Sequence, residues 1–208
     1  MTRITFNNLT KADGSALIDQ DDTIVQATVF GPVDIAQSKI NYEEAVVEIL
    51  FKPKINIPST SPAFDSVREI EDMLKQIFKE VILVRLHPRT SISILVQEIY
   101  NNGSLLSAAI NAVCCALIDA GLPLKCPVAG VSVRCEDIAN CTFDFVFDNN
   151  LDLITIITRG STTEESIKKA IKLGQDEAKK NFDSIRERVR QRFTLEEVNN
   201  SPDIGFDD

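Results

Sequence analysis

A glycine-containing turn before a helix of small residues is the part of this sequence best suited to hold an anion. The stretch NNGSLLSAA, residues 101–109, places Gly103 and Ser104 directly before a predicted helix. Backbone N–H groups at such a position point toward a bound phosphate, and the helix dipole favours negative charge there. No Lys or Arg stands in the first turn, and Leu105 occupies the next position. The stretch is therefore either a phosphate site without its cation or only a tight turn.

Basic side chains beside predicted loops form a second group of candidates, because such side chains contact the phosphates of nucleic acids. They are Lys52, Lys54, Arg68, Arg85 and Arg89. No aromatic residue is interleaved with them in the sequence, so the pattern does not indicate base stacking. Each of them taken singly is typical of a solvated surface charge.

Residues for catalysis or metal binding are sparse. The single histidine, His87, precedes a proline and has no evident partners for a Ser/His/Asp triad, so we interpret it as structural. Glu136, Asp137 and Asp144 are the only acidic group between predicted strands that could hold a divalent metal, and we interpret them as a polar turn. No GxGxxG or GxxxxGK[ST] motif is present. We expect no catalytic residue, no metal site and no cofactor.

The composition describes a single domain of modest acidity. The chain has 208 residues, 44% of them hydrophobic, and a formal net charge of −9, which argues against free-standing, non-specific nucleic-acid binding. No apolar run is long enough to span a membrane and no signal segment is evident, so we expect a soluble intracellular protein without a membrane partner. The five cysteines form no CxxC pair, and Cys114 and Cys115 lie in an apolar helix as buried thiols.

The order of predicted elements is strands, helix, strand, helix, strands, helix, which indicates an α+β domain of mixed sheets packed with helices. Asp21 and Asp22 predict a hairpin turn, Asn149 and Asn150 predict another, and Gly31-Pro32 is expected to end a strand. We expect strands at residues 4–9, 15–20, 23–32, 45–54, 90–100, 129–136, 141–148 and 151–160, and helices at 67–81, 103–120 and 162–193.

The last helix is predicted to start with a capping box made by Ser161 and Glu164. Its apolar stripe, at steps of three and four residues, is expected to face the core. The stripe comprises Ile167, Ile171, Gly174, Ala178, Phe182, Ile185, Val189 and Phe193. Residues 194–208 carry acidic side chains and no Lys or Arg, so we expect a disordered tail after a single domain at 1–193.

Several motifs together resemble the RNase PH family. They are DGSALIDQDDTIVQATVFGP near the start, EILFKPKINIP after it, and LHPRTSISILVQEIYNNGSLLSAAINAVCCALIDAGLPL in the centre. The resemblance covers residues 13 to about 193. It implies an RNase PH-like domain, of the same fold type as domain 2 of ribosomal protein S5.

The resemblance also explains the incomplete anion turn. Active members of the family use inorganic phosphate to cleave RNA from its 3′ end, and they hold the phosphate at a G-[ST]-R turn. In this chain the turn reads Gly103-Ser104-Leu105, with leucine in the place of the arginine. The family's acidic DLDYEEDS-like segment is shortened here, and Asp144 is the nearest match to a catalytic aspartate. Arg68 matches an arginine that begins the family's first helix. The resemblance therefore implies a non-catalytic member.

Within the family, the chain is most similar to the non-catalytic ring subunits of the eukaryotic RNA exosome, of the component 5 type. This implies that it pairs with other RNase PH-like subunits in a six-membered ring, binds S1/KH-type cap subunits, and lines a channel for RNA. Our RNA-binding candidates are Lys52 and Lys54, with Arg68 and Arg89. The implied location is the nucleus and nucleolus, and also the cytoplasm. The alternatives are a homodimeric phosphorolytic or metal-dependent nuclease with residual activity, and an unrelated small-molecule-binding module.

Overall fold

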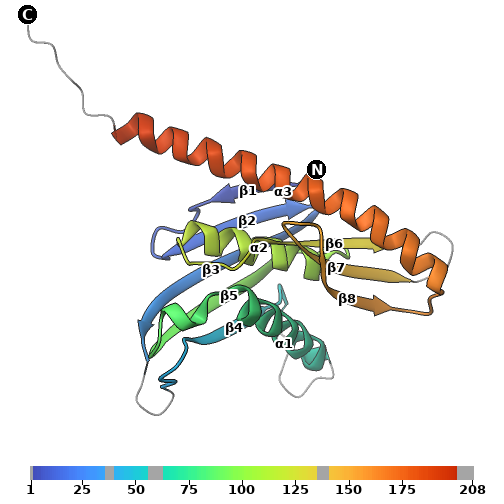
Figure 1. Ribbon diagram of the computed structural model, residues 1–208, viewed down its shortest axis with the longest axis horizontal. Coiled ribbons are helices and arrows are strands. Elements are labelled where there is room, and N and C mark those ends of the chain that lie inside the picture. Colours follow the sequence, from blue (N-terminus) through green and yellow to red (C-terminus); the bar gives the residue numbers. More distant parts are fainter. Residues whose placement is uncertain (1, 36–39, 56–62, 135–140, 201–208) are drawn as a thin grey trace, which may run out of the picture.

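The computed structural model describes residues 2–35, 40–55, 63–134 and 141–200 (Figure 1). Within these residues the chain forms two sheets and three helices, and the domain is α+β as predicted. The strands are β1 (Arg3–Phe6), β2 (Gly14–Gln20), β3 (Thr23–Asp34), β4 (Val46–Lys52), β5 (Thr90–Tyr100), β6 (Val128–Arg134), β7 (Thr142–Asp148) and β8 (Leu153–Arg159). The helices are α1 (Ala63–Val81), α2 (Leu105–Asp119) and α3 (Glu164–Asn200), with a short 3₁₀ turn, η2 (Val84–Leu86), before β5.

The larger sheet has five strands in the order β1-β2-β3-β5-β4, and the smaller has the order β6-β7-β8. All neighbouring pairs are antiparallel except β4 and β5. Asp21 and Asp22 both have positive φ, 50° and 60°, and connect the paired residues Gln20 and Thr23. This is the two-residue turn whose twist suits a hairpin, so the predicted turn between β2 and β3 is confirmed.

Helix α2 lies in the middle of the molecule and packs against both sheets (Figure 1). Nearly all its side chains are buried and many are small, as predicted for a central helix. A Cβ at Gly14 of β2 would lie 2.4 Å from the backbone of α2, and a Cβ at Gly130 of β6 would lie 2.7 Å from it. Glycine at these two positions therefore lets a strand from each sheet approach the helix closely.

One polar side chain inside this core connects the two sheets. Asn111 of α2 donates from Nδ2 to Gln20 Oε1 of β2 at 2.7 Å and to the carbonyl oxygen of Gly130 in β6 at 2.9 Å. Its Oδ1 accepts from the Gly130 N–H at 2.8 Å. Asn181 of α3 donates to the same Gly130 carbonyl at 3.4 Å. The buried Asn111 amide thus finds its hydrogen-bond partners in β2 and β6, one strand from each sheet.

Helix α3 crosses β1, β6 and β7 along one side of the molecule (Figure 1). Its predicted apolar stripe packs against the Phe143, Phe145 and Phe147 side chains of β7 and against the main core. The prediction is confirmed from Ile167 to Val189, and the side chain of Phe193 lies outside the described residues. Helix α3 is also joined to α2 by the ion pair between Arg192 and the buried Asp119 at the end of α2.

Some predicted boundaries are wrong. Helix α3 starts at Glu164, and the Ile167 N–H bonds to the Thr163 carbonyl, so Thr163 precedes the first turn and Ser161 does not cap the helix. The helix continues to Asn200, seven residues beyond the predicted end at 193. The first part of the predicted tail is therefore helical. Residues 201–208 lie outside the described ones, and the division into one domain and a tail stays a prediction.

Strand β3 does not end at Gly31-Pro32 as predicted. The register with β5 shifts between Phe30 and Val33, and the strand continues to Asp34. A β-bulge accommodates the proline because the extra residue leaves the ladder locally unpaired. The β7–β8 hairpin is longer than the predicted two-residue turn, since the chain closes it with residues 149–152.

No helix in the described part of the chain has the length and apolarity needed to cross a membrane. Cys114 and Cys115 are fully buried in α2, as predicted. Burial raises the pKa of Cys114 to about 11, which keeps this thiol protonated and unreactive near neutral pH.

Candidate functional site: the Gly103 turn and two cation–aromatic pairs

The turn before α2 already bonds to its own surroundings. Gly103, with φ of +107°, donates its N–H to Asn101 Oδ1 at 2.8 Å. The Asn102 N–H and the Ser104 hydroxyl both donate to Thr23 Oγ1, each at 3.1 Å. These are groups that a phosphate at the turn would otherwise attract. The turn is therefore a self-contained structure whose nearest donors serve β3 and the turn itself.

Leu105 does not take over the part of a phosphate ligand. Its side chain is half-buried and packs against the main hydrophobic core. The substitution replaces a guanidinium, which would form two parallel hydrogen bonds with an anion, by apolar packing. Losing such a charged hydrogen bond costs roughly 1.5–3 kcal/mol of binding.

A cation reaches the turn from elsewhere in the chain. Arg134, the last residue of β6, donates from Nη2 to the Asn102 carbonyl oxygen at 2.8 Å. A Cβ at position 103 would lie 2.5 Å from this nitrogen, so the glycine makes room for the guanidinium. Sequence reasoning missed Arg134. It is 31 residues from Gly103, and no local spacing relates the two.

The space beside the turn carries more negative than positive charge. A cavity of about 400 Å³ is lined by Asp21, Asp22, Asn102, Ser104, Ser132 and Arg134. The two carboxylates come from the β2–β3 hairpin and face a single guanidinium. Like charges at this range repel an incoming phosphate, which carries up to two negative charges itself. The cavity is thus poorly suited to hold inorganic phosphate.

Asp144 lies next to this cavity rather than in its lining. It stands opposite Ser132 in the β6–β7 ladder, is 6% exposed, and forms a side-chain hydrogen bond with Ser132. Burial raises the pKa of Asp144 above its usual range, while the Ser132 hydrogen bond and the charge of Arg159 oppose the rise. The match of Asp144 to a catalytic aspartate stays a prediction. Glu136, Asp137 and the shortened acidic loop lie outside the described residues.

The raised pKa predicts a stability effect. A carboxyl group with a raised folded-state pKa stabilises the fold while it is protonated, below its usual value of 3.8, and loses this contribution as the pH rises through the folded pKa. We therefore expect Asp144→Asn to raise the Tm at pH 7 and to leave it unchanged at pH 3. Thermal unfolding at both pH values measures this. Asp152→Asn, at an exposed carboxylate on the β7–β8 loop, is the control. A Tm at pH 7 below that of the wild type would contradict the prediction.

No other constellation for chemistry appears among the described residues. No group of three or more His, Cys, Asp or Glu side chains in this part of the chain is arranged to hold a metal ion. His87 follows the η2 turn, and its carbonyl accepts a hydrogen bond from Thr90 Oγ1 at 2.7 Å. Its Nε2 is buried without a partner among the described residues. The interpretation of His87 as structural stays a prediction.

The four RNA-binding candidates do not form one group. Lys52 and Lys54 lie at the C-terminal end of β4, and Arg68 is exposed on the first turns of α1. Arg89 directly precedes the N-terminal end of β5, and this extended strand separates it from the C-terminal end by roughly 35 Å. Contact of these residues with RNA stays a prediction.

The two tyrosines of the chain each lie beside one of these cations. The Lys54 ammonium is 5.4 Å from the centre of the Tyr100 ring, and the Arg89 guanidinium is 5.3 Å from that of Tyr42. Such distances are within the range of cation–π attraction. The interpretation that no aromatic residue accompanies the basic candidates is therefore wrong, because Tyr100 and Tyr42 lie beside two of them and Phe51 directly precedes Lys52 in the sequence.

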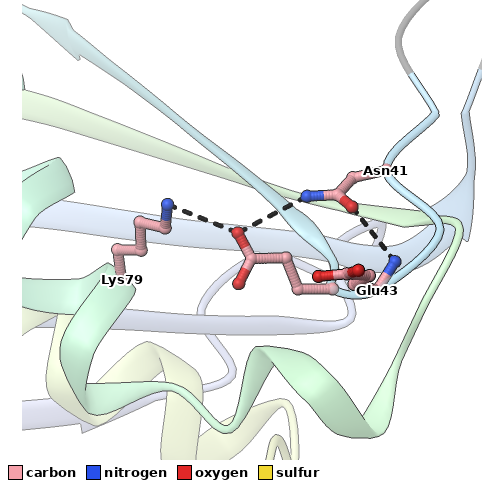
Figure 2. A network of polar contacts seen from close by, with 4 residues as sticks. Asn41, Glu43 and Lys79 are labelled. Atoms are coloured by element: carbon pink, nitrogen blue, oxygen red, sulfur yellow. Dashed lines mark hydrogen bonds and ion pairs between the residues drawn. The ribbon is translucent and has the colours of Figure 1, made fainter.

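A polar network fixes the segment that carries Tyr42 (Figure 2). Glu44 Oε1 accepts a hydrogen bond from Asn41 Nδ2 at 3.5 Å and forms an ion pair at 3.3 Å with Lys79, which lies in α1. The Glu43 N–H donates to Asn41 Oδ1 at 3.0 Å. The Arg89 N–H donates to the Asn41 carbonyl at 3.0 Å, which holds Arg89 beside Tyr42. The Arg89–Tyr42 pair thus lies beside a surface network that joins α1 to the chain before β4.

Comparison with known proteins relates the chain to one family. The family model described as "3′ exoribonuclease family, domain 1" matches residues 1–123. The rice (Oryza sativa subsp. japonica) protein called exosome complex exonuclease RRP46 homolog is 41% identical over 121 residues, which are 58% of this chain and 49% of that protein. The Arabidopsis thaliana protein of the same name is 38% identical over 120 residues, 57% of this chain and 48% of its own. The chain thus spans about half the length of these curated relatives.

The similarity in structure extends over nearly the whole chain. The crystal structure of rice Rrp46 superposes with a TM-score of 0.83 at 32% identity, covering 91% of this chain and 94% of that one. A chain of the Archaeoglobus fulgidus exosome with RNA bound to its active site superposes with a TM-score of 0.70, covering 93% and 88% of the two chains. At 16% identity the second match shows a common fold alone.

Proposed function

This chain belongs to the 3′ exoribonuclease family, and on that premise we propose that it is a non-catalytic ring subunit of an RNA exosome. The predicted resemblance to the RNase PH family is thereby confirmed. In the proposed role the chain supports 3′-to-5′ RNA processing and degradation, including rRNA maturation, by an associated exonuclease. Its relatives are named as exosome components, which agrees with such a ring position.

The observation that carries the non-catalytic part of the proposal is the Gly103 turn. Leu105 packs into the core where the resemblance implies an arginine, and Asp21 and Asp22 place negative charge in the cavity beside it. Either feature weakens phosphate binding, and together they disfavour a phosphate nucleophile at this position.

The proposed partners are other RNase PH-like subunits in a six-membered ring, S1/KH-type caps, and RNA in the shared channel. An exposed apolar edge supports the presence of a neighbouring subunit. Strand β8 is the last strand of its sheet, and its Leu153, Ile154 and Ile156 are 39%, 42% and 39% exposed. Isolated proteins usually protect such an edge with charges or a covering element. Nuclear, nucleolar and cytoplasmic location belongs to the same proposal.

Residual phosphorolysis is the second candidate function, and one observation favours it. Arg134 brings a guanidinium to the Gly103 turn, with Ser132 on the same strand and Asp144 on the adjoining β7. This arrangement supplies a cation by another route than the family's own turn. The net negative charge of the cavity lining argues against the candidate, as does the pairing of Arg134 with the Asn102 carbonyl.

Native mass and composition of the complex that contains the chain test the proposal. We expect the tagged chain, purified at low ionic strength without cross-linking, to elute in a particle with other RNase PH-like subunits and S1/KH-type proteins. Mass spectrometry of that particle gives the stoichiometry, with one copy of each ring subunit expected. A free homodimer as the only species would contradict the ring proposal and favour the nuclease.

A further inference from the structure

We propose that Tyr100 and Lys54 form a stacking platform for one base of single-stranded RNA, with Lys52 and Lys54 contacting the adjoining phosphates. The inference rests on the proposed function in taking RNA as the ligand. It adds a residue, Tyr100, that the sequence pattern did not single out, and it places base stacking at the C-terminal end of β5.

The position of Tyr100 makes its ring available. Tyr100 is the last residue of β5, pairs with Ile24 of β3, and is 49% exposed. The inward side chains of β5, such as Ile94 and Val96, are buried in the main core, whereas Tyr100 shares the opposite face with Gln97. A large aromatic ring left half-exposed at a strand end is a surface for another flat ring.

One cation lies at this ring and a second stands on the neighbouring strand. The Lys54 ammonium lies over it at 5.4 Å, and Lys52 stands opposite Gln97 in the β4–β5 ladder. A groove of about 430 Å³ is lined by Lys52, Lys54, Phe64 and Gln97 among others, and Lys54 is the residue that connects it to the Tyr100 ring. The one carboxylate in its lining, Glu71, accepts the Phe51 N–H at 2.8 Å and so is directed at the backbone of β4. The groove therefore carries net positive charge on a chain that is negative overall.

This combination matches single-stranded nucleic acid in particular. Proteins that bind single strands without sequence preference pair a basic groove with aromatic rings on which bases stack. An acidic peptide would use the lysines but would have no use for the exposed ring. Tyr100 also lies three residues before Gly103, so the platform and the turn belong to one short stretch of the chain.

Fluorescence anisotropy with a 12-nucleotide oligouridylate tests the platform, at low salt because the whole chain is acidic. We expect Tyr100→Leu to weaken binding by about tenfold or more and Tyr100→Phe to bind like the wild type, since a stacked base contributes that much by substitution. Lys54→Gln should weaken binding and lower the slope of log affinity against log salt by about 0.7, the value for one phosphate contact on a single strand. Tyr42→Leu, at the matched cation–aromatic pair on the other end of β5, should have no effect.

An oligonucleotide of the same length with abasic sugars separates stacking from indirect effects. Wild type and Tyr100→Leu should bind it equally, because it has phosphates and no bases. An equal loss on both oligonucleotides, or wild-type affinity in Tyr100→Leu, would overturn the platform. If the Tyr100→Leu variant failed to join the purified ring, Tyr100 would be a contact between subunits. This result would overturn the platform and leave the ring proposal intact. Tyr100-dependent binding by a chain that joins no ring would support the platform and refute the ring.

Discussion

The Asn111→Leu variant is expected to lose about 3–5 kcal/mol of its free energy of unfolding, because it leaves buried partners without hydrogen bonds. Leucine is close to asparagine in size, so the change leaves little cavity. The Gln20 Oε1 atom and the Gly130 N–H, however, lose their bonds of 2.7 and 2.8 Å to the amide. Each buried polar group left unpaired costs about 1–3 kcal/mol. Since Asn111 joins β2, α2 and β6, both sheets should loosen against α2.

Thermal and urea unfolding of the purified chain measure this loss. For a chain of this length we expect the Tm to fall by about 10 °C. Asn8→Leu makes the same chemical change at an exposed loop position and should leave the Tm within about 2 °C of the wild type. If Asn111→Leu unfolded like this control, the amide would not be the connection between the sheets that its hydrogen bonds indicate.

Gly14→Ala should destabilise the chain by about 3 kcal/mol or more, through a steric clash. The added Cβ would lie 2.4 Å from both the Ala116 carbonyl oxygen and the Ala120 nitrogen. Both are backbone atoms of α2 and its C-cap, so they cannot swing aside as a flexible side chain would. Strand β2 would have to move off the helix, and the packing between the two would open.

Gly121→Ala is the matched control for this prediction. Gly121 follows the same end of α2, but a Cβ there would meet no atom within 4 Å. Its φ of +68° makes alanine cost about 1–2 kcal/mol through backbone strain alone. We expect Gly14→Ala to have the lower Tm of the two variants in the same buffer. A smaller effect at Gly14 than at Gly121 would show that β2 can shift without cost.

Local patterns predicted the elements that local chemistry determines. The two-residue turn at Asp21 and Asp22, the strand at 90–100 and the small-residue helix before Gly121 follow from turn chemistry, β-branched alternation and a glycine stop. The end of α3 was missed because acidic composition was interpreted as disorder. No glycine or proline interrupts residues 175–201, and the first such residue is Pro202.

The candidate site was only half predictable for a related reason. The incomplete anion turn at Gly103, Ser104 and Leu105 is visible in the sequence, since its residues are consecutive. Arg134 reaches the turn through the pairing of β6 in the other sheet, and Tyr100 meets Lys54 across the β4–β5 pair. Contacts of this kind depend on strand order, which the sequence pattern does not specify.

Phosphorolysis by the purified chain is the measurement that tests the central claim, that the phosphate site is empty. Single-stranded RNA labelled throughout its length is incubated with the chain and inorganic phosphate, and released nucleoside diphosphates are quantified against a no-phosphate control. An active family member serves as the positive control. We predict no phosphate-dependent release from the wild type. Release that requires phosphate and is lost in both Arg134→Ala and Asp144→Asn would contradict the account, and would make Arg134 the functional substitute for the missing arginine.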